Sequence, residues 1–345
     1  TFVNYETLLD LDDNIFIKHF ETIQNIKSKV LHRELIKILS NLDIESQNEL
    51  SIKTYFIIKK LYDLGEIEKA YNLVKKININ SISNKESLEL FYFIELNYLY
   101  STFKLTEVCE LKSLLSELSI NLPMYLLEKS DIFCLTLENK FAEAKLLNSV
   151  LLESEKQTDK NFQKLFNYMT FKEIDNNSFE PLSGIKSKEL IFLYSAMLRI
   201  NELALDEDFI EIDPLNLSIP VILSESTDMG IRIKAANKAY IDEALSINSL
   251  SALYQSVDFK YDELLDLSNA AKKIDNKTEM KMAYLFQKAN IQILPITRIQ
   301  TLVEFWEFAD NEKLKLLAYD VSRNLIESIE PSLELADYGL EIIKA

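Results

Sequence analysis

The spacing of apolar residues is helical along most of the chain and is clearest in residues 52–77, IKTYFIIKKLYDLGEIEKAYNLVKKI. Apolar positions recur every three or four residues on both sides of Leu64-Gly65-Glu66, the pattern of two helices that each bury one face. Glycine relieves the backbone of a tight turn, and Ala70 lets the second helix approach the first closely. The segment therefore predicts a helical hairpin.

The same outline recurs twice downstream, in about residues 87–118 and in a segment that starts after Pro123. Proline is a favourable first residue of a helix. The pattern predicts two further hairpins. Their turns are expected near Thr102-Phe103-Lys104 and at Glu138-Asn139-Lys140, and Cys109 and Ala144 are expected at the position of Ala70.

Helical periodicity extends toward both ends of the chain. It covers residues 1–48, where Asp12 and Asp13 are candidate caps for the first apolar run. It resumes at residues 186–205 and again after Pro220. The expected helical runs in the last part are 228–244, 247–256, 260–274, 278–292, 296–309, 311–328 and 331–343.

Two segments interrupt this periodicity. Residues 175–184, DNNSFEPLSG, gather Asn, Ser, Pro and Gly, so we expect a linker over 175–185 that separates residues 1–174 from a helical array over 186–345. Residues 206–220 carry five carboxylates and two prolines. Because the acids lack the spacing of an EF-hand, this segment predicts a solvated loop.

Composition supports an all-α fold and limits the classes of partner. Four glycines and six prolines in 345 residues are few for a sheet protein, which needs many turn residues. A net charge of −17 argues against nucleic acid and anionic lipid as partners. No apolar run approaches the roughly 18–20 residues that span a bilayer. Thr1 suggests a mature exported chain whose signal was removed, or an internal piece, and the terminal LEIIKA suggests that the native polypeptide continues past Ala345.

The sequence offers little catalytic or metal chemistry, and we expect no catalytic residues, cofactor or metal. His19 and His32 lack the i, i+4 spacing of metal ligands, and no phosphate-binding glycine motif is present. Cys109 and Cys134 are expected on neighbouring helices, which leaves open both a disulfide and two buried thiols. Trp306, in VEFWEFA, indicates a core aromatic cluster in preference to a ligand-stacking residue.

Two family resemblances extend this picture. The small residues of the hairpins lie 39 and 35 positions apart, which resembles the tetratricopeptide (TPR) period of 34, although the usual Trp and closing Pro are missing. Segments such as AANKAYIDEALSINSLSALYQSVDF (235–259), AYLFQKA (283–289) and EPSLELADYG (330–339) resemble uncharacterised bacterial exported helical-repeat proteins, some of which carry an antifreeze-type label. The resemblance implies a helical-repeat fold and a periplasmic or otherwise exported location, with a cytoplasmic one as the alternative. It implies no known activity.

These observations predict an all-α, TPR-like superhelix (an α-solenoid of antiparallel hairpins), with a generic hairpin array as the alternative. The function expected is a non-enzymatic scaffold for a protein or peptide partner, because helical arrays present long concave surfaces. The alternative is an accessory domain of a cell-wall enzyme that resembles lytic transglycosylases, whose catalytic glutamate has an E-S context like Glu225-Ser226. Taking Gly65, Lys104 and Asn139 as equivalent turn positions, the residues expected to face a groove are Tyr55, Lys59, Tyr62, Asp63, Phe91, Ile94, Tyr98, Lys129 and Phe133.

Overall fold

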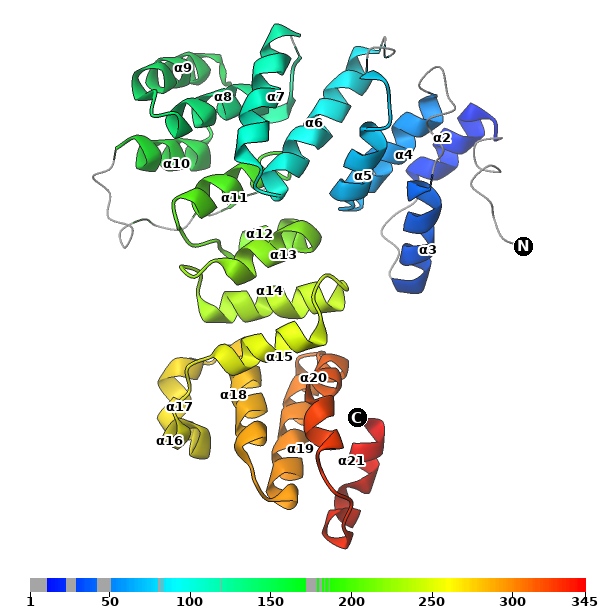
Figure 1. Ribbon diagram of the computed structural model, residues 1–345, viewed down its shortest axis with the longest axis vertical. Coiled ribbons are helices and arrows are strands. Elements are labelled where there is room, and N and C mark those ends of the chain that lie inside the picture. Colours follow the sequence, from blue (N-terminus) through cyan, green and yellow to red (C-terminus); the bar gives the residue numbers. More distant parts are fainter. Residues whose placement is uncertain are drawn as a thin grey trace. The chain divides into compact units, whose positions relative to one another are not determined.

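The computed structural model describes residues 11–22, 29–41, 51–79, 82, 84–118, 120–171, 179, 182, 184–185 and 187–345. In these residues the fold is all-α as predicted, with 75% helix and no strands (Figure 1). No helix in the described ranges is both long and apolar enough to serve as a membrane span. The chain divides into two compact units: the first comprises Thr1–Glu180 with Gly184–Asn201, and the second comprises Pro181–Ser183 with Glu202–Ala345.

The first unit contains the three expected helix pairs. In each pair the two helices contact each other, and each pair also contacts the next along the chain. The described helices of this unit are α2 (Asp13–Glu21), α3 (Lys29–Ser40), α4 (Ile52–Asp63), α5 (Ile67–Val74), α6 (Lys85–Ser101), α7 (Leu105–Glu117), the 3-10 helix η2 (Pro123–Tyr125), α8 (Leu126–Leu137), α9 (Phe141–Ser154), α10 (Lys160–Thr170) and α11 (Ile191–Ile200).

The three hairpin turns share one backbone geometry. Gly65, Phe103 and Asn139 have φ angles of 85°, 61° and 60°, and the N–H of the following residue donates to the carbonyl five residues back. This is the double-bonded helix end in which a left-handed residue follows the cap. Phe103, not Lys104, is therefore the equivalent of Gly65. Val108, which is fully buried, therefore occupies the position in the second hairpin that Ala70 occupies in the first. The expectation that Cys109 lies there is wrong by one residue.

The second unit begins with helices where the sequence pattern indicated a loop. Its elements are α12 (Glu207–Ile212), α13 (Pro214–Leu223), α14 (Met229–Ile241), α15 (Ile247–Ser256), α16 (Tyr261–Leu265), α17 (Leu267–Ile274), α18 (Thr278–Ile291), α19 (Pro295–Asn311), α20 (Lys315–Glu327), the 3-10 helix η4 (Leu333–Tyr338) and α21 (Gly339–Lys344). The solvated loop predicted over 206–220 is wrong because its acids act as caps: Asp206 accepts from the N–H of Asp208, and Asp213 from that of Asn216.

The division between the units also differs from the expected linker. Most of 175–185 lies outside the described residues, and α11, which was expected in the C-terminal array, belongs to the first unit. It does so because α11 packs against α6 and α10. The change of unit follows Asn201.

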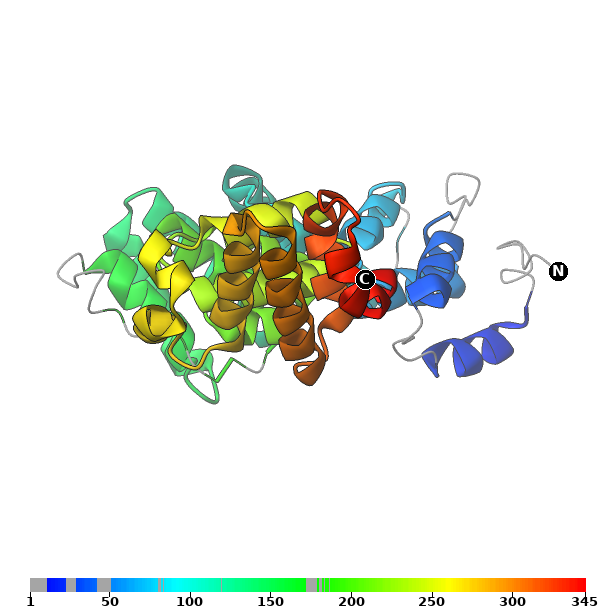
Figure 2. The same cartoon turned by 90° about the horizontal axis from the view of Figure 1, so that it is seen from below.

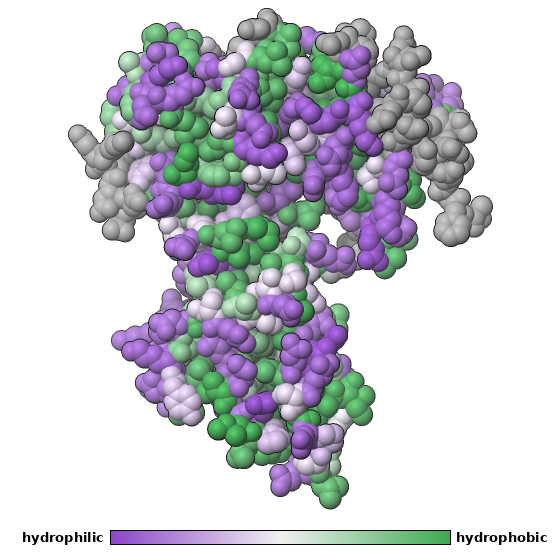
Figure 3. All heavy atoms as spheres, in the orientation of Figure 1, coloured by the Kyte–Doolittle hydropathy of each residue, from purple (hydrophilic) through white to green (hydrophobic). Residues whose placement is uncertain are grey.

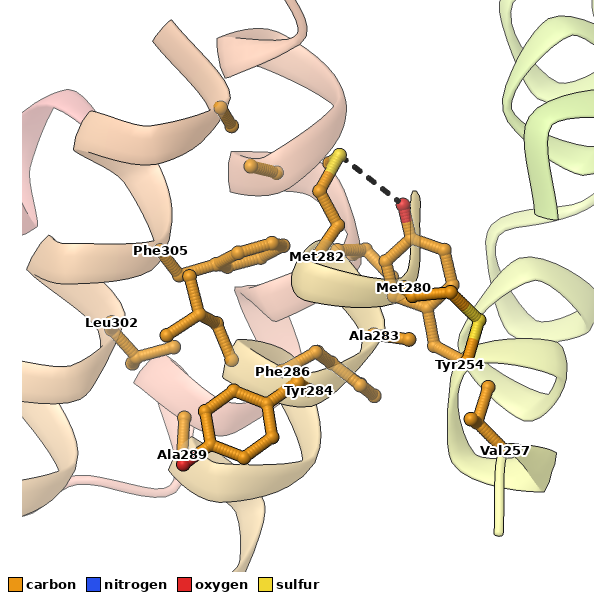
Figure 4. Close-up of a cluster of buried hydrophobic side chains, with 14 of the residues drawn as sticks. Tyr254, Val257, Met280, Met282, Ala283, Tyr284, Phe286, Ala289, Leu302 and Phe305 are labelled. Atoms are coloured by element: carbon orange, nitrogen blue, oxygen red, sulfur yellow. Dashed lines mark hydrogen bonds between the residues drawn. The ribbon is translucent and has the colours of Figure 1, made fainter. Parts of the chain in front are cut away.

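The core of the second unit is built around α18, which lies beside α19 in both views (Figures 1 and 2). Figure 4 shows Tyr254, Phe286 and Phe305 among the side chains that meet there. The Tyr254 hydroxyl donates to Asn237 Oδ1 at 2.8 Å, so this buried tyrosine is satisfied. Trp306 is 2% exposed and donates from Nε1 to Ser322 Oγ at 2.9 Å, which places it in the core as predicted.

Candidate functional site

Most of the residues expected to face a groove are buried instead. Tyr55 and Tyr62 are 9% and 7% exposed. Only Lys59, Asp63 and Tyr98 keep substantial exposure. The predicted groove is therefore wrong as a continuous surface, since the residues that are fully buried in helix packing are Phe91, Ile94, Lys129 and Phe133.

The burial of Tyr62 has a direct cause in the segment that leads into α11. The Lys188 ammonium lies 5.1 Å from the centre of the Tyr62 ring and donates to the Tyr62 carbonyl at 3.3 Å. The Tyr62 hydroxyl accepts from Asn97 Nδ2 at 3.1 Å. A position expected to receive a partner is thus covered by the chain itself.

The remaining groove residues are held by local contacts. Tyr98 stacks on Tyr71 with ring centres 4.0 Å apart. Tyr55 donates to Glu86 Oε1 at 3.1 Å, and burial together with the charge of Glu86 raises the pKa of Tyr55 to about 12. Burial raises the pKa of the Asp63 carboxyl, although Lys59 and Lys188 act in the opposite direction.

Lys129 is the centre of a buried ionic cluster. Its ammonium lies 2.8 Å from Glu155 Oε1 and 3.0 Å from Asp159 Oδ2, and it donates to the Met124 carbonyl at 2.9 Å. Tyr194, on α11, donates to Asp159 Oδ2 at 2.5 Å. Burial and the charge of Asp159 raise the pKa of Tyr194, so this hydroxyl stays a neutral donor. The cluster therefore joins α8, the α9–α10 connection and α11.

This cluster fixes an unusual turn at the start of α8. Met124 and Tyr125 have φ angles of 54° and 55°, a conformation that disfavours residues with a side chain. Lys129 holds the Met124 carbonyl, and the Tyr125 hydroxyl donates to the Ser154 carbonyl at 2.9 Å. The Tyr125 ring is thereby placed beside the end of α9.

A hollow of about 180 Å³ lies next to this turn, between α8 and α9. Two acidic residues, Glu128 and Asp131, line the hollow. Asp131 is already paired with Lys112 at 2.5 Å, whereas exposed Glu128 has no ion pair among the described residues. The complete lining is Tyr125, Glu128, Asp131, Ile132, Leu147, Val150, Leu151 and Ser154.

Apolar side chains continue from the hollow onto the surface of α9. Leu146 is 67% exposed and Val150 is 52% exposed, one helical turn apart on the same helix. Over the region of α8–α10, Figure 3 shows hydrophobic atoms in separate groups between hydrophilic ones. The hollow and these two side chains form the candidate site, which we call the α8–α9 site.

A disulfide ties α8 to the preceding hairpin. Cys109 and Cys134 are bonded and their Cα atoms are 5.7 Å apart, so the two cysteines are neighbours as expected. The Lys112–Asp131 pair makes a second link between α7 and α8. Both links restrict how far α8 can move at the α8–α9 site.

Other sequence candidates are dispersed over the fold. His19 is exposed, and His32 Nε2 lies 3.8 Å from Glu66 Oε1. Glu225 is exposed in the turn between α13 and α14, where Ser226 donates to the Glu202 carbonyl. Within the described ranges, no three His, Cys, Asp or Glu side chains are grouped so that they could hold a metal ion.

Sequence reasoning missed the α8–α9 site, although a signal was present. Leu146, Leu147, Val150 and Leu151 form an apolar stripe on one side of the predicted helix, which identifies an apolar surface but not how much of it other helices cover. No sequence signal indicates the left-handed turn at Met124 and Tyr125, because neither residue type favours that backbone conformation.

Comparison of the chain with protein-family models, with curated proteins and with solved structures gave no match. The α8–α9 site is therefore assigned from its geometry alone. The resemblance to exported helical-repeat proteins stays an expectation from the sequence.

Proposed function

We propose that this protein is a non-enzymatic interaction scaffold whose hairpins stack as a TPR-like α-solenoid. The observation that carries the proposal is the exposure of Leu146 and Val150 beside the hollow. Apolar side chains that adjoin one another at the surface mark protein interaction sites more often than isolated ones do. The partner is then a protein or peptide that covers this part of α9.

Two further features support this proposal. The turn geometry of Gly65, Phe103 and Asn139 recurs at Glu243 and Lys313, as a repeated hairpin unit requires. The Cys109–Cys134 disulfide supports an oxidising compartment such as the periplasm, in agreement with the export that the sequence resemblance implies.

The test is site-directed photo-crosslinking in the native cell, with the full chain. The photoreactive residue benzoylphenylalanine is placed at position 146, and in a control at position 30, because Val30 is also exposed, at 58%. We expect a defined partner to crosslink at 146 and not at 30. The purified partner should bind the parent chain, and it should bind Val150→Asp at least tenfold more weakly than Val30→Asp.

The proposal fails if position 146 gives no defined crosslink, or if positions 30 and 146 capture the same proteins equally. Equal binding of the purified partner to Val150→Asp and to Val30→Asp would also contradict it. Thermal melting of both variants shows that they are folded, so weaker binding reports on the surface and not on unfolding.

A further inference from the structure

We propose that the hollow of the α8–α9 site binds one arginine side chain of the partner. This inference rests on the proposed scaffold function and adds the chemistry by which the site selects its ligand. Four observations carry it: the size of the hollow, its apolar lining, a carboxylate in that lining that has no ion pair within the described ranges, and a preformed wall.

The size of the hollow favours a single side chain over a small molecule. Its volume is about 180 Å³, whereas pockets for cofactors and drug-sized ligands span roughly 300–1,000 Å³. Protein interfaces are commonly anchored by one side chain that fills a small pocket, with Trp, Tyr and Arg the most frequent anchors. The hollow has the dimensions of such an anchor site.

The lining selects for a side chain with an apolar stem and a cationic end. Ile132, Leu147 and Leu151 supply apolar surface, along which an arginine can lay its methylene groups. Glu128 supplies an exposed carboxylate with no ion pair in the described residues, which can accept two parallel N–H bonds from a guanidinium. Trp and Tyr, the other frequent anchors, can each donate only one hydrogen bond to this carboxylate and leave its negative charge uncompensated.

Arginine fits the rim better than lysine does. A guanidinium is planar and stacks on aromatic faces, whereas an ammonium is a compact, strongly hydrated charge. Tyr125 lines the hollow with part of its surface exposed. The net charge of −17 adds a general attraction for a basic partner, which increases the rate of association.

The wall of the hollow is preformed. Tyr125 is fixed by its bond to Ser154, and the turn before it is fixed by buried Lys129. The Lys112–Asp131 pair holds the second carboxylate in place and leaves Glu128 as the acceptor. A rigid site loses little conformational entropy when it binds, which favours affinity.

The experiment selects ligands from a displayed library of random peptides on the full, oxidised chain, with Val150→Asp as the counter-selection target. Because Val150→Asp adds a carboxylate to the lining, peptides that bind through arginine alone are removed, and we expect those that remain to share an arginine next to an aliphatic residue that contacts Val150. The best peptide is then synthesised with arginine and with citrulline, which has nearly the same shape and no charge. Calorimetric titration should show binding at least tenfold weaker for citrulline, because hydrogen bonds between charged groups are stronger than those between neutral groups.

Matched variants locate the arginine contact. Glu128→Gln should weaken binding of the arginine peptide about tenfold and leave binding of the citrulline peptide unchanged. Glu110→Gln, which removes one exposed carboxylate from α7, should change neither. Tight binding of the citrulline peptide, equal effects of the two Gln variants, or a selection that yields no arginine overturns the proposal.

The failure of this inference can be distinguished from failure of the scaffold function. If a partner crosslinks at position 146 and binds Glu128→Gln as tightly as the parent chain, the arginine is wrong and the scaffold stands. If position 146 has no partner, the scaffold proposal itself fails.

Discussion

At the scale of single residues, Lys129 has a large effect on how the helices of the first unit pack. Burying an ammonium costs several kcal/mol, and that cost is offset only where good geometry and enough partners are present. Glu155, Asp159 and the Met124 carbonyl supply these partners, and the Tyr194 hydroxyl bonds to Asp159. The cluster stabilises one arrangement of α8, α10 and α11 over others.

Replacing Lys129 by methionine should lower the free energy of unfolding by about 3–5 kcal/mol, because two buried carboxylates lose their cation. Urea unfolding measures this change. Lys140→Met, which removes an exposed lysine that pairs with Glu138, should have little effect.

A triple variant separates charge from packing in this cluster. Adding Glu155→Gln and Asp159→Asn to Lys129→Met removes the uncompensated charges and should recover part of the lost stability. A triple variant that is no more stable than Lys129→Met would show that packing, and not charge, explains the loss.

Tyr240 gives a pH-dependent contribution to stability. Its hydroxyl donates to Asp320 Oδ2 at 2.7 Å, and burial together with Asp320 raises the pKa of Tyr240 from 10.0 to about 12. A raised pKa in the folded state means that the contribution is complete below the unfolded value and is lost as the pH rises from about 10 to about 12.

Tyr240→Phe should therefore show a shallower fall in the free energy of unfolding across this pH range than the parent chain does. The measurement is urea unfolding at a series of pH values, with Tyr261→Phe as the control because Tyr261 is 67% exposed. Parallel curves for parent and Tyr240→Phe would contradict the assignment.

At the scale of elements, the way in which each first helix ends determines the spacing of the hairpins. Four of the left-handed turns, at Gly65, Phe103, Asn139 and Lys313, are followed five residues later by a fully buried residue: Ala70, Val108, Ala144 and Ala318. The turn at Glu243 differs, because exposed Asn248 occupies that position. Only the first of these turns has glycine, so the other turns adopt an unfavourable backbone conformation for the sake of packing.

Lys313→Gly should relieve this strain and raise the free energy of unfolding by about 0.5–1 kcal/mol. Lys313 has a φ of 62° and an exposed side chain, so the change removes little packing. Urea unfolding tests it, with Glu312→Gly as the control, since Glu312 has a φ of −89° and glycine at a position with negative φ should destabilise. A loss of stability in Lys313→Gly would show that the turn is not strained.

Local pattern predicted the elements well where packing agreed with it. The runs predicted over residues 228–343 correspond to α14–α21, with two departures: Asp266 separates α16 from α17, and the last run is divided into the 3-10 helix η4 and α21. The loop prediction for residues 206–220 is wrong because the acidic residues that favour loops also cap helices. The pattern of carboxylates alone does not distinguish the two uses.

The burial of the predicted groove residues could not be predicted from local pattern, because it depends on contacts between residues that are distant in sequence. Tyr62 is covered by Lys188, and Lys129 is neutralised by carboxylates that lie beyond α9. No periodicity in α4 or α8 shows that these contacts exist. The α8–α9 site shares this limit, since its wall depends on a backbone turn that its residues do not favour.

At the scale of the whole molecule, the two units are compact bodies within one chain. Units that each have their own core commonly unfold as separate cooperative steps. The chain's single tryptophan, Trp306, lies in the core of the second unit, so its fluorescence reports on that unit alone.

Calorimetry should accordingly resolve two unfolding transitions, only one of which coincides with the change in Trp306 fluorescence. Lys129→Met should lower the midpoint of the other transition and leave the fluorescence midpoint unchanged. A single transition, or equal shifts of both midpoints in Lys129→Met, would show that the units unfold together.

The packing of α11 on α6 also has a consequence for synthesis. Most helices in each unit contact the next helix along the chain, so hairpins can close as they leave the ribosome, N-terminal part first. The contact between α6 and α11 joins segments that are distant in sequence and carries a larger loop-closure cost. Until Lys188 and residues 191–200 have emerged from the ribosome, the nascent chain exposes Tyr62, which Lys188 later covers, and the face of α6 that α11 later covers. For that interval these surfaces are accessible to a chaperone, and they become inaccessible once α11 has emerged and packed on α6.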